Sequence, residues 1–270
     1  MEVIKAIILG IIQGVTEWLP VSSTGHMILA NEFIHLLGGK NKDFVDLFLV
    51  VIQFGSILAV VTLYFNRLNP FSPKKTEQEK QATWTMWFKV LVAEIPAAVV
   101  GLLCDDFIDE KLYNWYIVAI MLIVYGIAFI IVEKRKREAT ILSIDGISYK
   151  TALLMGVFQM LALVPGTSRS GATILGAVIL GTSRAVAAEF SFFLAVPVMF
   201  GASLLKLVKY GFDMSGGELG LLLVGMATAY IVSVFSIKFL VEFVKKHDFT
   251  PFGWYRIILG AVIFAYFLLR

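Results

Sequence analysis

The chain has 270 residues, a mean hydropathy of +0.84, a net charge of +3 and 16% charged residues. Soluble domains carry about 25% charged residues, so this composition excludes a soluble globular protein. The small net charge gives no reason to expect a nucleic-acid partner. A single cysteine, Cys104, excludes an internal disulfide and a cysteine-based metal site. Met1–Gly10 lacks the pattern of a signal peptide, so we expect it to belong to the mature protein.

The first half of the chain predicts two short helices followed by three long ones. The short helices are expected at 1–18 and 23–37, because Pro20 removes a backbone donor and interrupts the apolar run. A bilayer is crossed by about 20 apolar residues in a helix. Such spans are expected near 44–65, 83–103 and 113–133.

The second half predicts the same order of elements. Short helices are expected at 150–164 and 170–181 on either side of Pro165, and spans at 184–209, 217–243 and 252–269. Two half-helices that meet at a polar tip form a re-entrant hairpin, which is tolerated where protein or trapped water satisfies the exposed backbone. The fold class is therefore an all-α polytopic membrane protein with two re-entrant helical hairpins and about six transmembrane helices.

The two halves also resemble each other in sequence. With a shift of 146 positions, GIIQGVTEWLPVSSTGHMIL (10–29) falls without gaps on GVFQMLALVPGTSRSGATIL (156–175). The first segment meets identical residues at Gly10, Gln13, Ser22, Gly25, Ile28 and Leu29. We interpret 1–270 as one membrane domain made of a first repeat, 1–135, and a second repeat, 150–270. Each repeat has an odd number of full spans, so the second is expected to be inverted.

The basic residues predict the orientation. One side of the membrane would receive twelve: Arg67, Lys74, Lys75, Lys80, Lys134, Arg135, Lys136, Arg137, Lys150, Arg184, Lys245 and Lys246. The other would receive five: Lys40, Lys42, Lys111, Lys209 and Arg270. Cytoplasmic loops carry an excess of Lys and Arg, so the first side is expected to be cytoplasmic and both termini to lie outside.

The inverted arrangement brings two polar tips together near the middle of the membrane. They are LPVSSTGH (19–26) and VPGTSRSGAT (164–173). A charged side chain at this depth costs roughly 2.5–3.5 kcal/mol, so it indicates a functional site by default. Glu17, His26 and Arg169 are such residues. An ion pair between Glu17 and Arg169 that only holds the two halves together is the structural alternative.

Both tips have the features of an anion site. Each leads from a proline break into a half-helix, and the N-terminus of a helix presents free N–H groups and a partial positive charge. Arg169 adds a planar fork that matches phosphate. Glu17 and His26 can move protons near neutral pH, and Ser23 can attack phosphorus. Gln13 and Glu17 lie four residues apart, on one helical face, and can share a divalent cation.

These motifs resemble those of the bacterial undecaprenyl-diphosphatases of the bacitracin-resistance type. The first signature is Gln13–Glu17 followed by Leu19–His26, and the second is Pro165–Thr173. Glu189–Phe192 and Leu194–Pro197 also fit, so the resemblance covers nearly the whole chain. Gln13 stands where some members have Glu, which shifts the acid–base role to Glu17 and His26.

The resemblance implies hydrolysis of undecaprenyl pyrophosphate to the monophosphate carrier lipid that peptidoglycan synthesis uses. It also implies a role in bacitracin resistance, a divalent cation (Mg or Ca) held by Glu17, a homodimer and an outward-facing site in the bacterial plasma membrane. The implied catalytic residues are Glu17, Ser23, His26 and Arg169. The implied substrate-binding residues are Gln13, Ser22, Thr24, Gly25, Ser168, Ser170, Gly171 and Thr173.

Other interpretations stay open at this point. A polyprenyl-phosphate transporter or flippase would use the same broken helices and inverted repeat. An acid-phosphatase fold is imitated by Gly25–His26, but its other motifs are missing. Ser23, His26 or a water molecule can be the attacking group. Glu94 is another acid in an apolar run, but it matches no motif and is left out of the site.

Overall fold

The computed structural model describes residues 1–39, 41–135, 137–211 and 214–269. In this part of the chain, six helices are long and apolar enough to cross a membrane. They are α3 (Lys42–Leu63), α5 (Glu77–Phe107), α6 (Trp115–Lys134), α9 (Arg184–Tyr210), α10 (Gly216–Lys246) and α11 (Thr250–Leu268). The all-α membrane fold with six long helices is confirmed. Lys40, Lys136 and Arg270, which enter the charge count, lie outside the described residues.

Shorter helices flank the two proline breaks. They are α1 (Glu2–Thr16), α2 (Ser23–Asn31), α7 (Tyr149–Met160), the 3₁₀ turn η3 (Leu161–Leu163) and α8 (Arg169–Ile179). Two more short helices are the 3₁₀ helix η1 (Leu36–Gly39), which precedes α3, and α4 (Phe65–Leu68), which follows it. The π turn η2 (Ile108–Leu112) extends α5.

Two helix boundaries differ from the prediction by six residues, more than the others. The helix expected at 23–37 ends at Asn31. The backbone beyond it bonds to the start of α1: Lys5 Nζ donates to the His35 carbonyl (2.7 Å), and the Leu37 N–H donates to Glu2. The span expected from residue 83 begins at Glu77, because Thr76 and Glu79 bond reciprocally at its N-terminus, where they form a capping box.

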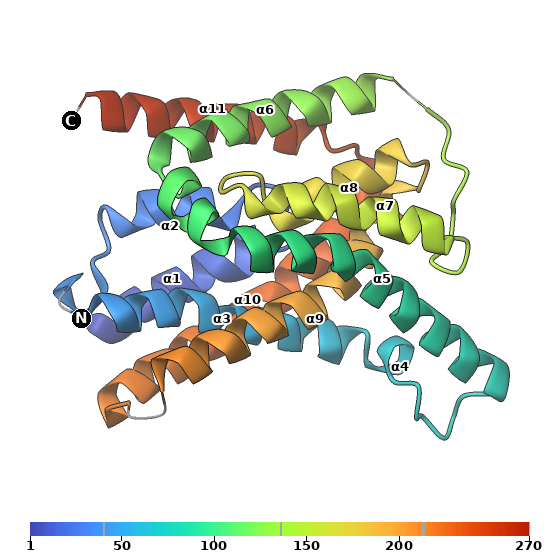
Figure 1. Ribbon diagram of the computed structural model, residues 1–270, viewed down its shortest axis with the longest axis horizontal. Coiled ribbons are helices and arrows are strands. Elements are labelled where there is room, and N and C mark those ends of the chain that lie inside the picture. Colours follow the sequence, from blue (N-terminus) through green and yellow to red (C-terminus); the bar gives the residue numbers. More distant parts are fainter. Residues whose placement is uncertain (40, 136, 212–213, 270) are drawn as a thin grey trace.

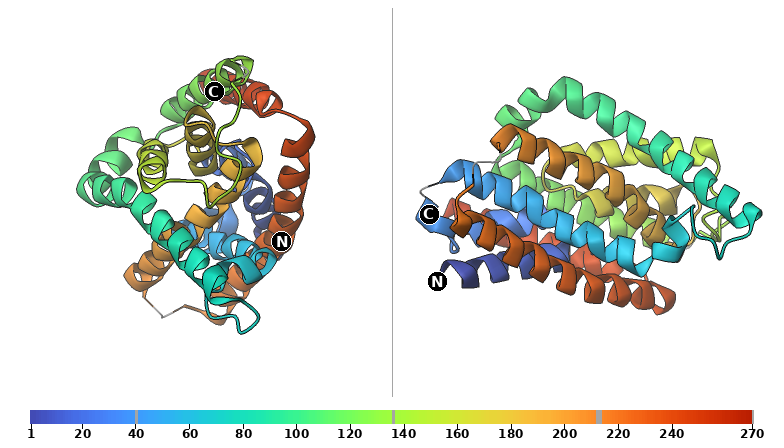
Figure 2. Two further views of the ribbon diagram at one scale, coloured as in Figure 1. Left: turned by 90° about the vertical axis from the view of Figure 1, so that its right-hand side faces the viewer. Right: turned by 90° about the horizontal axis from the view of Figure 1, so that it is seen from below.

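The helices of the two halves pack against one another. α1 lies against α10, α7 against α5, α3 against α9, and α6 against α11 (Figures 1 and 2). Each of these four pairs therefore combines one helix of the first half with one helix of the second. A two-fold axis that relates the two halves would produce pairs of this kind. The inverted repeat and the re-entrant hairpins stay predictions.

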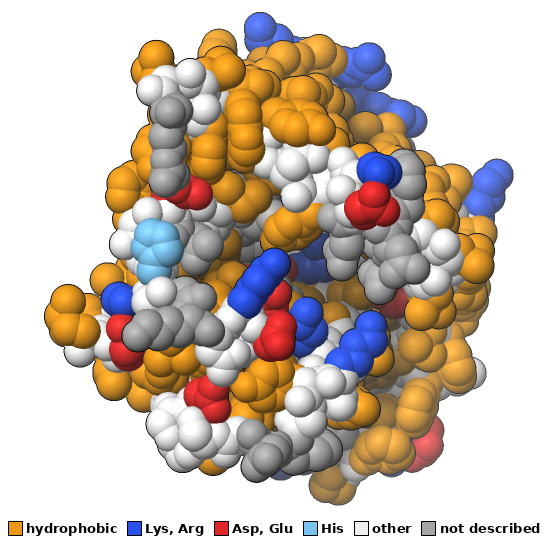
Figure 3. Space-filling model, turned by 60° about the vertical axis from the view of Figure 1, so that its left-hand side comes forward, with side chains coloured by type: hydrophobic (Ala, Val, Ile, Leu, Met, Phe, Trp, Pro, Cys, Tyr) orange, Lys and Arg blue, Asp and Glu red, His pale blue; other side chains and the backbone are white. Residues whose placement is uncertain are grey.

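The chain ends and the basic loops lie at opposite ends of the helix bundle. The N-terminus and the C-terminal end of α11 are both at the left in Figure 1, and the loops that join α4 to α5 and α6 to α7 are at the right. Large apolar side chains are exposed along the outer helices, for example Leu102 (81%) and Leu103 (79%) on α5. Figure 3 shows hydrophobic side chains over most of one face, with charged side chains gathered around a hollow. An apolar exterior of this kind suits a lipid environment.

Candidate active site

Each polar tip is shaped by a serine at the start of a half-helix. Ser22 has φ 71° and precedes α2, and Ser168 has φ 74° and precedes α8. Both hydroxyls accept a hydrogen bond from the N–H three residues on, from Gly25 (3.3 Å) and Gly171 (3.1 Å). The two serines are equivalent under the 146-residue shift. A non-glycine residue in the left-handed region costs about 1–3 kcal/mol and is typical of functional sites.

Glu17 connects the two tips. Its carboxylate is 7% exposed. Gln13 Nε2 donates to its Oε2 (3.0 Å), and Ser23 Oγ donates to the same oxygen (3.2 Å). Arg169 Nη2 approaches the other oxygen, Oε1, at 3.2 Å. The ion pair weighed as a structural alternative is therefore present, and it lies in direct contact with the hydroxyl of Ser23.

A residue of α9 holds the other side of Arg169. The Nη1 atom of Arg169 donates to the carbonyl of Ser191 at 2.7 Å. The hydroxyl of Ser191 also lies 2.7 Å from Thr173 Oγ1. The guanidinium is 5.8 Å from the ring of Trp18. Arg169 is thus fixed from three directions. Ser191 was not among the predicted site residues, although it belongs to a segment that fits the family.

A cavity of about 240 Å³ opens between the tips. Five predicted site residues line it: Glu17, Ser23, Thr24, Ser168 and Arg169. Gln53 and Gln159 also line it and were not predicted. Gln159 is the position that matches Gln13 in the repeat, so the sequence did contain a signal for it. The remaining wall is mainly apolar, and Ala97, Val198 and Met199 contribute to it.

His26 does not share a contact with Glu17 or Ser23 in the structure. Its Nδ1 lies 2.7 Å from the carbonyl of Ser22, and its Nε2 lies 2.7 Å from the hydroxyl of Tyr255. The two rings stack with their centroids 5.6 Å apart. His26 is not among the residues that line the cavity. A catalytic role for His26 stays a prediction, and the structure places it to support the start of α2.

Three predicted substrate-binding hydroxyls have partners inside the protein. Ser22, Ser170 and Thr173 are at most 1% exposed. Ser170 Oγ donates to the carbonyl of Glu17 (3.0 Å), and Thr173 Oγ1 donates to the carbonyl of Arg169 (2.8 Å). These hydroxyls hold the tips together. Substrate contacts by them and by Gln13, Gly25 and Gly171 stay predictions.

The donor set limits how a divalent cation can bind. Among the described residues, no group of three His, Cys, Asp or Glu side chains could hold a metal ion. Of the carboxylates that the structure describes, only Glu17 lines the cavity, and Gln13 lies beside it. Mg²⁺ commonly binds through one or two carboxylates together with substrate phosphates. The residues present fit a cation that is shared with a phosphate-bearing ligand.

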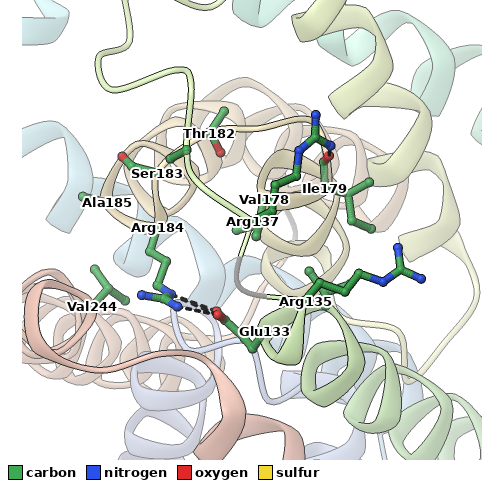
Figure 4. Close-up of a pocket in the computed structure, with 12 residues that line it drawn as sticks. Glu133, Arg135, Arg137, Val178, Ile179, Thr182, Ser183, Arg184, Ala185 and Val244 are labelled. Carbon is green, nitrogen blue, oxygen red and sulfur yellow. Dashed lines mark hydrogen bonds and ion pairs between the residues drawn. The ribbon is translucent and has the colours of Figure 1, made fainter.

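A second cavity, of about 360 Å³, lies at the end with the basic loops. Figure 4 shows that Arg184 points to Glu133, and their closest atoms are 2.5 Å apart, while Arg135 and Arg137 extend away from this pair. The guanidinium groups do not converge on one point, and Glu133 balances the charge of Arg184. No predicted site residue lines this cavity. We therefore place the candidate active site at the tips.

The fold and the cavity define a polytopic membrane protein with a polar site between two helix N-termini. The family model of the bacitracin resistance protein BacA matches residues 6–262. The chain therefore belongs to this family, which confirms the resemblance seen in the two tip motifs.

Curated relatives match over almost the full chain. An undecaprenyl-diphosphatase of Enterococcus faecalis is 58% identical over 269 residues, which are 98% of this chain and 97% of the relative. One of Acetivibrio thermocellus is 57% identical over 99% of this chain and 98% of its own. One of Streptococcus thermophilus is 55% identical over 98% of this chain and 93% of its own.

The buried ion pair gives a prediction about stability. Arg169→Ala leaves the carboxylate of Glu17 without a cation, and removal of one partner of a buried pair costs about 3–5 kcal/mol. We expect a clear fall in the melting temperature in detergent, and partial recovery in the double variant Glu17→Gln, Arg169→Ala. Lys245→Ala, which breaks an exposed pair with Glu242, is the control and should not change the melting temperature. An unchanged melting temperature for Arg169→Ala would contradict this account.

Proposed function

We propose that this protein is a phosphatase that hydrolyses undecaprenyl pyrophosphate to undecaprenyl phosphate and inorganic phosphate. The observation that carries the proposal is the contact of Ser23 and Arg169 with the same carboxylate, Glu17, in a cavity between two helix N-termini. The names of the curated relatives support it. The reaction would recycle the carrier lipid for peptidoglycan synthesis and would contribute to bacitracin resistance.

The geometry supports Ser23 as the attacking group. Covalent catalysis commonly uses a nucleophile, a base and a group that orients the base. Ser23 would be the nucleophile, Glu17 the base and Arg169 the group that orients it. Ser23 Oγ would attack the terminal phosphorus and give its proton to Glu17. The bond from phosphorus to the bridging oxygen breaks, and undecaprenyl phosphate leaves. Water then hydrolyses the phosphoserine, which releases inorganic phosphate and restores Ser23.

Before substrate binds, Arg169 orients the carboxylate of Glu17. The incoming diphosphate would then draw the Nη2 side of the guanidinium from Glu17, while Nη1 keeps its bond to the carbonyl of Ser191. The planar guanidinium matches the oxygens of a phosphoryl group and stabilises the charge that develops in transfer. The same movement frees the carboxylate of Glu17 to take the proton of Ser23. The 3.2 Å distance between Ser23 and Glu17 favours Ser23 over His26, which bonds to Tyr255 instead.

The transporter interpretation has less support. The names of the curated relatives describe an enzyme. A site that only binds and carries an anion would not need a serine hydroxyl directed at a carboxylate.

A divalent cation, Mg or Ca, is proposed to accompany the substrate. Glu17 and Gln13 would hold it from the protein side, and the phosphate oxygens would complete its oxygen ligands. When bound, the cation neutralises part of the diphosphate charge.

The orientation and assembly are also proposals. The loops with the most basic residues would face the cytoplasm of a bacterial cell, so the cavity would receive substrate from the outer side of the plasma membrane. We further propose a homodimer, on the family resemblance.

The proposed reaction is tested by phosphate release. Purified protein in detergent should release inorganic phosphate from undecaprenyl pyrophosphate. Ser23→Ala should lower kcat by roughly 10²–10⁴-fold, because it removes the group whose proton Glu17 accepts. Ser143→Ala, in the exposed loop between α6 and α7, is the control. A loss of only about tenfold in Ser23→Ala would favour water as the attacking group, and no release by the wild-type protein would reject the proposed function.

The proposed cation is tested with a chelator. Phosphate release should stop when divalent cations are removed and return when Mg²⁺ or Ca²⁺ is added, because a single carboxylate cannot balance a diphosphate. The measurement is the initial rate against the concentration of free cation. A full rate in the presence of the chelator would exclude a required cation.

The orientation is tested by thiol labelling in a Cys104→Ser background. Glu110→Cys, in the π turn η2 that follows α5, should react with an impermeant reagent in intact cells. Lys74→Cys, in the basic loop before α5, should react only after the cell is opened, because positive loops face the cytoplasm. Both residues are exposed. The reverse pattern would overturn the orientation.

A further inference from the structure

Arg256 is a fully buried arginine outside both tip motifs. It lies on α11, and 0% of its side chain is exposed. Its guanidinium donates to the carbonyls of Pro20 (3.1 Å), Gly166 (2.9 Å) and Thr167 (2.8 Å). Nε is 3.5 Å from the carbonyl of Leu122. All of these acceptors are backbone carbonyls.

These carbonyls belong to both proline breaks. Pro20 lies in the first tip, and Gly166 and Thr167 come directly before Ser168 in the second. A break in a helix frees carbonyls that need new donors, and no bulk water is available for them inside a membrane protein. A single side chain supplies donors to both tips. Arg256 therefore fixes the distance between the two helix starts that flank the cavity.

The charge of Arg256 has no carboxylate partner among the described residues. Three other arginines pair with buried or half-buried acids: Arg169 with Glu17, Arg184 with Glu133 and Arg67 with Glu189. Arginine stays ionised in proteins, and carbonyls orient toward its charge but do not cancel it. Glu17 and Arg169 balance each other, and Glu94 accepts a hydrogen bond from Gln159 in the cavity wall (2.7 Å). Arg256 adds a positive charge directly at the carbonyls of the tips. A charge in this position is costly, which indicates a function.

Gly171 makes room for this guanidinium. A Cβ built at Gly171 would lie 2.8 Å from Arg256 Nη1. The guanidinium of Arg256 therefore lies against the first turn of α8. Arg169 belongs to the same turn. A side chain at position 171 would have to displace it.

We propose that Arg256 is a positioning residue for the diphosphate site, an inference that rests on the proposed function. It holds the two tips in register through their carbonyls. It also supplies the positive charge that attracts the diphosphate, without touching it. The two effects of Arg256, on the position of the tips and on the charge of the site, can be tested separately. Lysine keeps the positive charge but cannot donate hydrogen bonds to several carbonyls in one plane.

The test compares Arg256→Lys and Arg256→Met by kcat, KM and melting temperature in one detergent. Arg256→Lys should keep a KM close to the wild-type value and lose roughly 10²-fold in kcat, because small displacements of the tips cost that much. Arg256→Met removes the charge as well, so its KM should also rise about tenfold. Arg184→Lys, on a partly exposed arginine that pairs with Glu133 and does not line the cavity between the tips, should change neither kcat nor KM.

Gly171→Ala tests the same inference with Arg256 retained. The added methyl group displaces the guanidinium, so kcat should fall while KM changes little. Gly220→Ala, where no atom lies within 4 Å of the added Cβ, is the matched control. If Arg256→Met does not fold, the kcat and KM of Gly171→Ala and Arg256→Lys test the inference without it.

Wild-type kcat and KM in both Arg256→Lys and Gly171→Ala would overturn the inference. So would a lower melting temperature with unchanged kcat and KM, because a purely structural residue would give that result. If the wild-type protein releases no phosphate, the proposed function fails by itself. Binding of inorganic pyrophosphate by calorimetry then tests Arg256: weaker binding by Arg256→Met supports the inference, and equal binding overturns it.

Discussion

The structure depends on one constraint: backbone groups freed by a broken helix need partners where water is scarce. The chain breaks two helices, at Pro20 and Pro165, and each break is satisfied by local and distant donors. Ser22 and Ser168 cap the following helices through their own hydroxyls. Arg256 donates to carbonyls of both breaks. The satisfied breaks leave the N-termini of α2 and α8 facing a cavity, which is why the polar site forms there.

The same constraint explains why a single carboxylate is shared by two halves of the chain. Glu17 follows α1 and receives a donor from its own helix, from its own tip and from the opposite tip. A buried carboxylate with several donors is held in one orientation. This orientation aims one oxygen at Ser23 and the other at Arg169, so stabilisation of the fold and preparation for chemistry use the same atoms.

The hydroxyls of the tips divide into two groups by their surroundings. Ser23 and Thr24 line the cavity, whereas Ser170 and Thr173 donate to backbone carbonyls and are buried. Sequence motifs contain both groups without distinction, because a helix start requires capping residues and ligand-binding residues of the same type. Mutation of a buried member would act through the position of the tip, and mutation of a cavity member would act on the ligand directly.

The sequence by itself determined the membrane class, the six long helices and the two polar tips, because hydropathy and proline breaks are local properties. It also placed Glu17, Ser23 and Arg169 in one site, because the repeat aligned their motifs. Tertiary structure decided the rest. Only packing shows that His26 bonds to Tyr255 and that Ser191 holds Arg169, since these partners lie far apart in the sequence. Arg256 belongs to no sequence motif, and the role we infer for it follows only from its hydrogen bonds to carbonyls of both tips.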